Sequence, residues 1–377
     1  MIDPLIHTLL TKPSISPKDA GCQDILAAYL RRLGFELTAY NQGDVTNLYA
    51  KKTGKKPGPS LMFAGHTDVV PTGPQADWYA DPFVPTEKEG YLYARGAADM
   101  KVALACMVLA CDAFIQQHPD HCGDIAFLIT SCEEKTTLDG TDYVMKQLIA
   151  RGESIDYCIV GEPSSEQTIA DQIRIGRRGS LSGCLTVQGK QGHVAYPHHA
   201  VNPIHQALSA LQSLTNHVWD EGYGPFAPTT FQFSSIHAGT GATNVIPGTL
   251  IAEFNLRYSP ALTATEIQTT IIELLSTDHL DMSVSWSQGG EPFLSQAGAL
   301  REAVDDSVLA LMGHRPKHST DGGTSDARFI APHGIETIEL GFCHQTIHQV
   351  NECIPIQDIS ILQTIYQRIL GQLLNDQ

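Results

Sequence analysis

The apolar run Leu61-Met62-Phe63-Ala64 leads directly into the polar sequence Gly65-His66-Thr67-Asp68. Two similar runs follow, Ile125 to Thr130 before Cys132-Glu133-Glu134, and Tyr157 to Val160 before Gly161-Glu162-Pro163. Helical patterns separate these runs, near 21–33, 100–117 and 141–150. Such alternation is typical of an α/β sheet with helices on both faces, and ligands bind at the carboxyl ends of its strands. The sequence therefore predicts an α/β fold with polar side chains at one edge of the sheet.

The pattern changes between residues 180 and 290. The expected elements there are strand 181–187, helix 203–218, strands 230–236 and 249–258, helix 264–276 and strand 282–286. Their βαββαβ order is that of a ferredoxin-like domain. Residues 295–377 return to an α/β pattern, and 377 residues exceed the usual size of a single core. We therefore predict two domains: residues 1–178 and 294–377 form a catalytic metal-binding domain, and residues 179–293 form an inserted domain.

Composition excludes several classes of function. The net charge of −17 argues against nucleic acid or anionic lipid as the main partner, because both require a broad basic surface. A small anionic substrate can still be bound by a few local arginines. No apolar run is long enough to span a membrane, and no secretory signal is recognised, so we expect a cytoplasmic protein. The nine cysteines contain no CxxC pair, which argues against a disulfide framework. The lysine-rich stretch at 51–59 is interpreted as a solvated hairpin turn.

Five side chains together supply the ligand types of a hydrolytic metal site, imidazole nitrogens and carboxylate oxygens. They are His66, Asp99, Glu134, Glu162 and His348. Each alone is more often a hydrogen-bonded or solvated polar residue, so the hypothesis depends on their joint placement. Asp99 precedes an apolar helix and could be its N-cap, a role compatible with bridging two ions. Asp68 could accept the spare imidazole N–H of His66 and so fix its tautomer, or could be a turn aspartate.

The adjacent pair Glu133-Glu134 is costly at the end of a buried strand. Like charges raise each other's pKa unless a cation or a proton compensates them. In the loop after a strand, one glutamate can bind a metal while its neighbour faces the substrate. The pair therefore favours a metal ligand and a general base side by side, with an exposed acidic turn as the alternative.

These motifs, with Arg95-Gly96-Ala97-Ala98-Asp99-Met100-Lys101 and Thr346-Ile347-His348-Gln349-Val350-Asn351-Glu352, resemble the signatures of the co-catalytic zinc peptidases and deacylases. The resemblance implies two Zn²⁺ per subunit, which Co²⁺ can replace. One zinc is bound by His66, Asp99 and Glu162, and the other by Asp99, Glu134 and His348. It further implies that Asp68 orients His66, that Glu133 is the general base, and that the inserted domain forms a homodimer and acts as a lid.

Four further motifs resemble the branch of that family that hydrolyses the succinyl amide of N-succinyl-LL-2,6-diaminopimelate, in lysine and cell-wall precursor biosynthesis. They lie at 178–181, 192–197, 243–247 and 322–326. The resemblance implies that substrate is bound by Arg178, Ser180, His193, Asn244, Arg257, Gly323 and Thr324, with His193 and Asn244 reaching the active site of the other subunit. Taken alone, the arginines could form ordinary salt bridges and His193 could be structural.

One departure from that branch lies beside a proposed ligand. His344-Gln345 stands before Thr346-Ile347-His348, where Asn-Ala is usual. The metal ligands do not separate this branch from acetylornithine-type deacylases or small peptidases. A metal-binding scaffold without turnover is the remote alternative, and the presence of Glu133 argues against it.

Overall fold

The computed structural model describes residues 2–135, 138–276 and 281–375. The chain divides into two compact units. Unit 1 comprises Met1–Gly176, Leu294–Ser319 and Ser325–Gln377, and unit 2 comprises Arg177–Phe293 and Thr320–Thr324. The short segment Thr320–Thr324 packs with unit 2, whereas the sequence analysis placed it in the metal-binding domain. This difference puts Gly323 and Thr324 in the same unit as the other residues expected to bind substrate.

Unit 1 is built on an eight-stranded sheet. Its strands, in spatial order, are β1 (Glu36–Ala39), β2 (Asn47–Thr53), β6 (Cys122–Thr130), β3 (Lys56–His66), β7 (Tyr157–Val160), β18 (Glu336–Glu339), β8 (Gln172–Arg174) and β17 (Lys317–Ser319). The neighbours β6, β3, β7 and β18 run parallel, so their carboxyl ends lie at one edge. His66 and Glu162 are therefore positioned at this edge, together with the Glu133-Glu134 loop.

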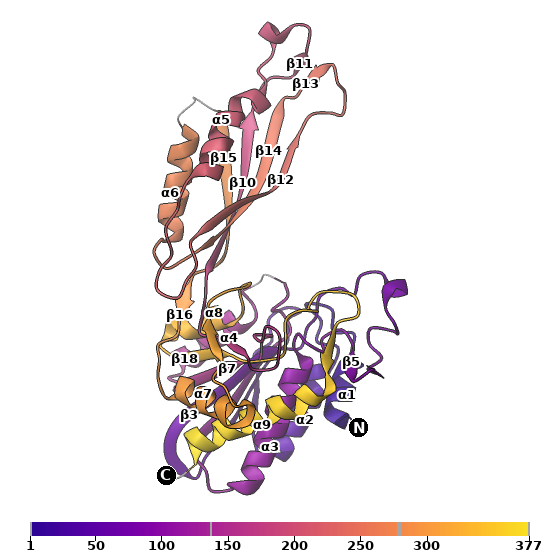
Figure 1. Cartoon of the computed structure of the whole chain (residues 1–377), viewed down its shortest axis with the longest axis vertical. Coiled ribbons are helices and arrows are strands. Elements are labelled where there is room, and N and C mark those ends of the chain that lie inside the picture. The colour runs from indigo at the N-terminus through magenta and orange to yellow at the C-terminus, as the bar shows by residue number, and fades with distance from the viewer. Residues whose placement is uncertain (1, 136–137, 277–280, 376–377) are drawn as a thin grey trace. The chain divides into compact units, whose positions relative to one another are not determined.

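Helices bury both faces of this sheet, which confirms the predicted α/β fold (Figure 1). Leu61 and Phe63 belong to a core with α3 and α9, and the alternate residues Met62 and Ala64 are buried on the opposite face. The helices are α1 (Pro4–Leu10), α2 (Cys22–Arg32), α3 (Lys101–Gln117), α4 (Thr141–Ala150), α7 (Ala299–Met312), α8 (Ala327–Ile330) and α9 (Ile356–Leu374). α3 is apolar on all sides because it is almost completely buried.

The lysine-rich stretch at 51–59 is not a hairpin, so that interpretation is wrong. β2 ends at Thr53 and β3 begins at Lys56, but β6 lies between the two strands and pairs with both. The turn between them contacts the start of β6, where the Gly54 amide donates to the carbonyl of Gly123 at 2.8 Å. A Cβ atom at residue 54 would lie 2.2 Å from that oxygen, so glycine is required for this close approach.

A small three-stranded sheet brings two distant segments of unit 1 together. Its strands are β4 (Thr86–Lys88), β5 (Tyr91–Tyr93) and β19 (Cys353–Pro355). Tyr93 pairs with Cys353 in this sheet. Asp99 follows β5 and His348 precedes β19, so this pairing holds the two loops that carry them at a fixed register.

Unit 2 has the predicted βαββαβ order. Its elements are β10 (Gly179–Gln188), α5 (Pro203–Asn216), β12 (Thr230–Ala238), β14 (Thr249–Tyr258), α6 (Ala264–Leu275) and β15 (Met282–Gly290). The antiparallel sheet has the order β12-β14-β10-β15, and α5 and α6 cover one face (Figure 1). Leu181, Phe254 and Ile267 belong to the core between them. The other face is polar, because Ser180, Ser182 and Asn255 alternate with these buried residues.

The remaining elements are short. They are η1 (Gln75–Asp77), β9 (Gly176–Arg177), β11 (Gly192–His193), η2 (Pro197–His199), β13 (Val245–Ile246), β16 (Phe293–Leu294) and η4 (Ala331–His333). All nine cysteines lie in the described ranges, and none of them forms a disulfide. Among the helices of those ranges, none is both long and apolar enough to cross a membrane.

Candidate metal centre

Asp99 lies between two histidines in unit 1. Its Oδ1 is 3.1 Å from Nε2 of His66, and its Oδ2 is 3.5 Å from Nε2 of His348. One oxygen for each histidine is the arrangement that a carboxylate bridging two cations requires. The N-cap interpretation of Asp99 is wrong, because α3 begins at Lys101 and its N-cap, Met100, forms no side-chain cap bond.

Each histidine also contacts a second carboxylate. His66 Nε2 is 3.5 Å from Oε1 of Glu162, and His348 Nε2 is 3.1 Å from Oε1 of Glu134. The structure therefore brings together the five expected ligands as two sets of three that share Asp99. Glu133 lies beside them, since donor atoms of His66, Glu133 and Glu162 are within 4.8 Å of one another.

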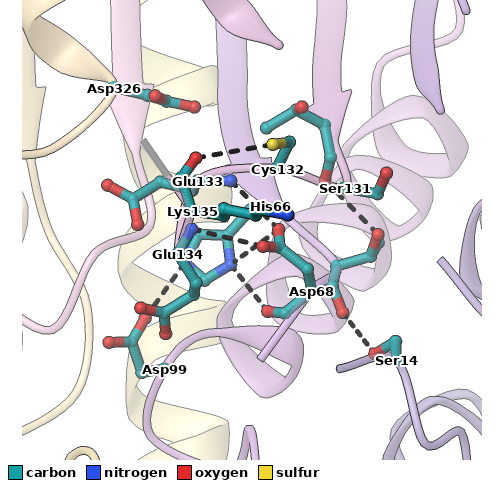
Figure 2. Close-up of polar contacts among 12 residues, drawn as sticks. Ser14, His66, Asp68, Asp99, Ser131, Cys132, Glu133, Glu134, Lys135 and Asp326 are labelled. Carbon is teal, nitrogen blue, oxygen red and sulfur yellow. Dashed lines mark hydrogen bonds and ion pairs between the residues drawn. The ribbon is translucent and has the colours of Figure 1, made fainter. Parts of the chain in front are cut away.

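Asp68 organises this site differently from the expectation. Nδ1 of His66 lies 2.9 Å from the backbone carbonyl of Asp68, but 3.6 Å from its carboxylate. Since a carbonyl only accepts, Nδ1 carries the proton and Nε2 is left as the ligand atom. The Asp68 carboxylate instead accepts the backbone amides of Glu133 and Glu134, each at 3.2 Å (Figure 2). This side chain therefore holds the loop with the two glutamates and also lies within ion-pair distance of the imidazole.

The carboxylates at the site carry more negative charge than the nearby side chains balance. Burial, together with the charge of Asp99, raises the pKa of Glu162 to about 7. Burial and the charge of Glu162 also raise the pKa of Glu133 well above its ordinary value. Oε1 of Glu162 is buried and accepts no hydrogen bond. An unsatisfied buried carboxylate oxygen beside a second carboxylate fits the binding of a cation.

The same carboxylates raise the pKa values of the two histidines. Hydrogen bonds to Asp99 and Glu134 raise the pKa of His348 to about 10. Burial opposes protonation of His66, but the neighbouring carboxylates of Asp99 and Glu162 raise its pKa well above the ordinary value. Burial would raise the pKa of Asp99, yet hydrogen bonds from His348 and His66 lower it. The protein's own groups thus retain protons on both imidazoles, and a metal would have to displace them.

The residues expected to bind substrate all lie in unit 2. Ser180 on β10 is directly opposite Arg257 on β14, so both side chains lie on the polar face of the sheet. Arg178, two residues before Ser180, is half-buried and donates to the carbonyl of Pro228 at 3.4 Å. Asn255 lies on the same face, where its Nδ2 donates to the Ser180 hydroxyl at 3.1 Å. The sequence analysis missed Asn255, although its spacing of two from Arg257 places both on one face.

His193 and Asn244 are neighbours in a loop region of unit 2. The amide of Val194 donates to the carbonyl of Asn244 at 3.1 Å, and both predicted site residues are exposed. Nδ1 of His193 is 3.0 Å from the amide of Ala195 and accepts its hydrogen. The neutral imidazole therefore carries its proton on Nε2, where it can be donated.

The second predicted group in unit 2 is a turn. Gly323 is exposed and Thr324 is half-buried. Arg177 donates to the carbonyl of Asp321 in the same turn at 2.9 Å.

Two buried acids near the metal ligands were missed by the sequence analysis. Asp326 accepts the hydroxyl of Thr141 at 2.6 Å, and Glu352 accepts from Arg95 at 2.8 Å. In the sequence analysis, both residues are included only as members of longer motifs, and neither of them is given a role. These hydrogen-bond partners lie 185 and 257 positions away in the sequence, so no local sequence pattern indicates the contacts. His344 is half-buried, and its backbone amide donates to the carbonyl of Ser165 at 3.1 Å.

Comparison with known proteins places these features in a family. The model of peptidase family M20/M25/M40 matches residues 62–372. A succinyl-diaminopimelate desuccinylase of Nitrosococcus oceani is 51% identical over 99% of this chain and 98% of its own. The enzyme of that name from Bordetella parapertussis is 50% identical, with coverages of 98% and 97%.

Solved structures share the fold at low identity. An M20 family metallo-carboxypeptidase of Sulfolobus solfataricus superposes with a TM-score of 0.83 at 18% identity and covers 99% of both chains. A tripeptidase of Staphylococcus aureus gives a TM-score of 0.80 at 23% identity, covering 97% of this chain and 95% of its own. From the match to its model and from relatives at half identity over nearly the full length, this chain belongs to peptidase family M20/M25/M40.

Proposed function

We propose that this protein is a metal-dependent amidohydrolase that cleaves N-succinyl-LL-2,6-diaminopimelate to succinate and LL-2,6-diaminopimelate. Asp99 between His66 and His348 is the observation that carries the hydrolytic chemistry. Relatives named succinyl-diaminopimelate desuccinylase, about half identical over almost the whole chain, support the choice of substrate. The enzyme would act in lysine and cell-wall precursor biosynthesis, in the cytoplasm.

The five ligands fit two divalent cations. His66, Asp99 and Glu162 would hold one ion, and Asp99, Glu134 and His348 the other, with Asp99 shared. Imidazole and carboxylate ligands suit zinc, and cobalt would replace it. When bound, the ions would acidify water and polarise the carbonyl of the succinyl amide. The unsatisfied Glu162 oxygen and the crowded carboxylates support this assignment, since a cation compensates both.

Glu133 is the general base of the proposed reaction. Its carboxylate lies with those of the proposed ligands, and the backbone amides of its loop donate to the Asp68 carboxylate, which fixes the loop independently of any metal. It takes a proton from the attacking water as the carbon–oxygen bond forms. When the carbon–nitrogen bond breaks, Glu133 returns that proton to the departing amine.

Unit 2 supplies recognition. The substrate carries three carboxylates, and Arg178, Arg257 and Ser180, with the turn at Gly323 and Thr324, would bind them. The protein would form a homodimer through unit 2, with Asn244 contributing to the active site of the other subunit. His193 would reach the same site, where its Nε2–H would stabilise the developing oxyanion. Its tautomer supports this role, because Nδ1 already accepts a hydrogen bond within the loop.

The deciding experiment compares two substrates. Purified protein is treated with a chelator and then supplied with zinc, and hydrolysis of N-succinyl-LL-2,6-diaminopimelate and of N-acetylornithine is followed side by side. We expect zinc-dependent release of succinate and little release of acetate. Preference for the acetylated substrate would replace the desuccinylase assignment by an acyl-amino-acid deacylase. No turnover of either substrate with two metals bound would contradict both.

A further inference from the structure

The buried carboxylate of Glu352 binds the loop that carries Asp99. Its Oε2 accepts from Nη1 of Arg95 at 2.8 Å and from the amide of Gly96 at 3.0 Å. Its Oε1 accepts from the amides of Ala98 at 2.8 Å and Asp99 at 3.1 Å. The side chain is only 1% exposed. One carboxylate therefore accepts four hydrogen bonds, three of them from the backbone of a single turn.

The same residue is connected to the loop of the second histidine. Glu352 follows His348 by four positions, and its backbone carbonyl accepts the amide of Ala94 at 3.1 Å. The hydroxyl of Thr346 donates to the carbonyl of Cys353 at 2.9 Å and accepts its amide at 3.1 Å, which closes the loop between them. Any shift of Glu352 would thus move the Asp99 turn relative to His348.

We propose that Glu352 is a positioning residue for the dinuclear site. Its carboxylate fixes the backbone of residues 96–99 so that the two oxygens of Asp99 face His66 and His348. This inference rests on the proposed function, because it assumes that Asp99 binds both metals. Residues that orient ligands from outside the coordination shell change metal affinity by about 10–100-fold when they are replaced.

An ordinary buried ion pair between Arg95 and Glu352 is the alternative. An ion pair stabilises the fold, but it has no need of three backbone amides aimed at the same carboxylate. Here those amides occupy lone pairs on both oxygens. Glu352→Gln keeps the size of the side chain but turns one oxygen into an NH₂ group, which faces donors on either side. A positioning residue and an ordinary ion pair would both lose stability in this variant. Only the positioning role also predicts weaker binding of metal.

The test measures zinc affinity by calorimetry for chelator-treated wild type and Glu352→Gln, alongside the visible spectrum of the cobalt-loaded proteins. We expect the variant to bind metal about 10–100-fold more weakly, with an altered cobalt spectrum and a lower kcat at a similar KM. Unchanged affinity and an unchanged spectrum would overturn the inference. Failure of the wild type to bind metal would instead overturn the proposed function.

Glu336→Gln is the matched control. Its carboxylate also accepts two backbone amides, from Leu300 at 3.1 Å and Arg301 at 2.9 Å, but at the start of β18, the end opposite the carboxyl edge. We expect this variant to lose stability in urea while its zinc affinity stays within about twofold of wild type. Equal loss of zinc affinity in both variants would show a global effect and overturn the specific role of Glu352.

Glu352→Asp serves if the glutamine variant does not fold. It keeps the negative charge beside Arg95, but its carboxylate is one methylene short of the turn. We expect a folded protein with weakened zinc binding and a changed cobalt spectrum. Wild-type affinity in this variant would show that the charge alone suffices, and the positioning role would be wrong.

Discussion

Several polar site residues of the two units lie in different settings, although His348 of unit 1 is exposed and Ser180 of unit 2 is buried. In unit 1, His66 is 1% exposed, and Asp99 and Glu162 are each 7% exposed. Both carboxylates contact the imidazole of His66. In unit 2, His193 and Asn244 are exposed on short strands and loops. Groups that hold a cation need fixed positions before it arrives, whereas groups that recognise a substrate can become ordered when it binds. Changes in unit 1 should therefore affect metal binding or kcat, whereas changes in unit 2 should affect interactions with the substrate or assembly and leave metal affinity unchanged.

Glu133→Gln tests the unit 1 side of this comparison most severely. The amide cannot take a proton from water, so we expect kcat to fall by about 10²–10⁴-fold while two zinc ions remain bound. Steady-state kinetics and metal analysis measure both effects. Glu87→Gln, an exposed change on β4, is the control and should retain full turnover. Substantial activity in Glu133→Gln would exclude Glu133 as the base.

His193→Ala tests whether the exposed loop of unit 2 serves another subunit. We expect a loss of about 10²–10³-fold, as for removal of an oxyanion donor. Mixing this variant with Glu133→Gln under conditions that exchange subunits should restore activity to about a quarter of wild type per site, since half of the dimers would contain one complete site. Each variant incubated alone is the control. No recovery despite proven exchange would show that His193 acts within its own chain or not at all.

Proton release tests the buried charges of unit 1. The neighbouring carboxylates raise the pKa of His66, and that of His348 to about 10, which favours the protonated imidazoles, whereas binding of metal requires them neutral. Zinc affinity should therefore rise with pH, by about tenfold per unit for each proton released. Calorimetry at pH 6 and pH 8 in buffers of different ionisation enthalpy measures this. Zinc binding to His348→Gln should release fewer protons than zinc binding to the wild type. Equal zinc affinity of the wild type at both pH values would contradict the assignment of protonated imidazoles to the metal-free protein.

Arg257→Lys should have the smallest effect. Lysine keeps the charge but loses the two-pronged geometry of guanidinium, so we expect KM to rise about tenfold with zinc affinity unchanged. Substrate kinetics and zinc calorimetry separate the two readouts. Arg315→Lys, at an exposed ion pair with Asp306, is the control and should leave both unchanged. A change in metal affinity in Arg257→Lys would break the division of roles between the units.

The sequence predicted the strands β3, β6 and β7 of unit 1 because they are followed by chemically distinctive residues. The apolar run before His66 and the run before Glu133-Glu134 each predicted a strand, and the polar residues that follow each run predicted a metal ligand. The βαββαβ order of unit 2 was likewise predicted from periodicity. By contrast, the neighbours of β6 and the packing of Thr320–Thr324 depend on pairings between distant segments, which local patterns do not contain.

Side-chain direction was the other limit of prediction. Asp68 was expected to contact the imidazole of His66; its carboxylate lies 3.6 Å from Nδ1, and it also accepts the amides of the Glu133-Glu134 loop, which the sequence did not indicate. Asp99 was considered as an N-cap, yet the helix begins two residues later. In both cases the residue type was informative, and the partner was decided by backbone geometry that spacing alone does not specify.

The discontinuity of unit 1 has a consequence for synthesis on the ribosome. β18 lies inside the large sheet, and His348 follows it, so neither is available until the chain Arg177–Phe293 has been made. Unit 2, whose main segment is continuous, can gain its core while the N-terminal strands still lack their neighbour. The edge of β7 that pairs with β18 therefore stays unpaired until β18 emerges, and an unpaired strand edge favours association with other chains during this interval.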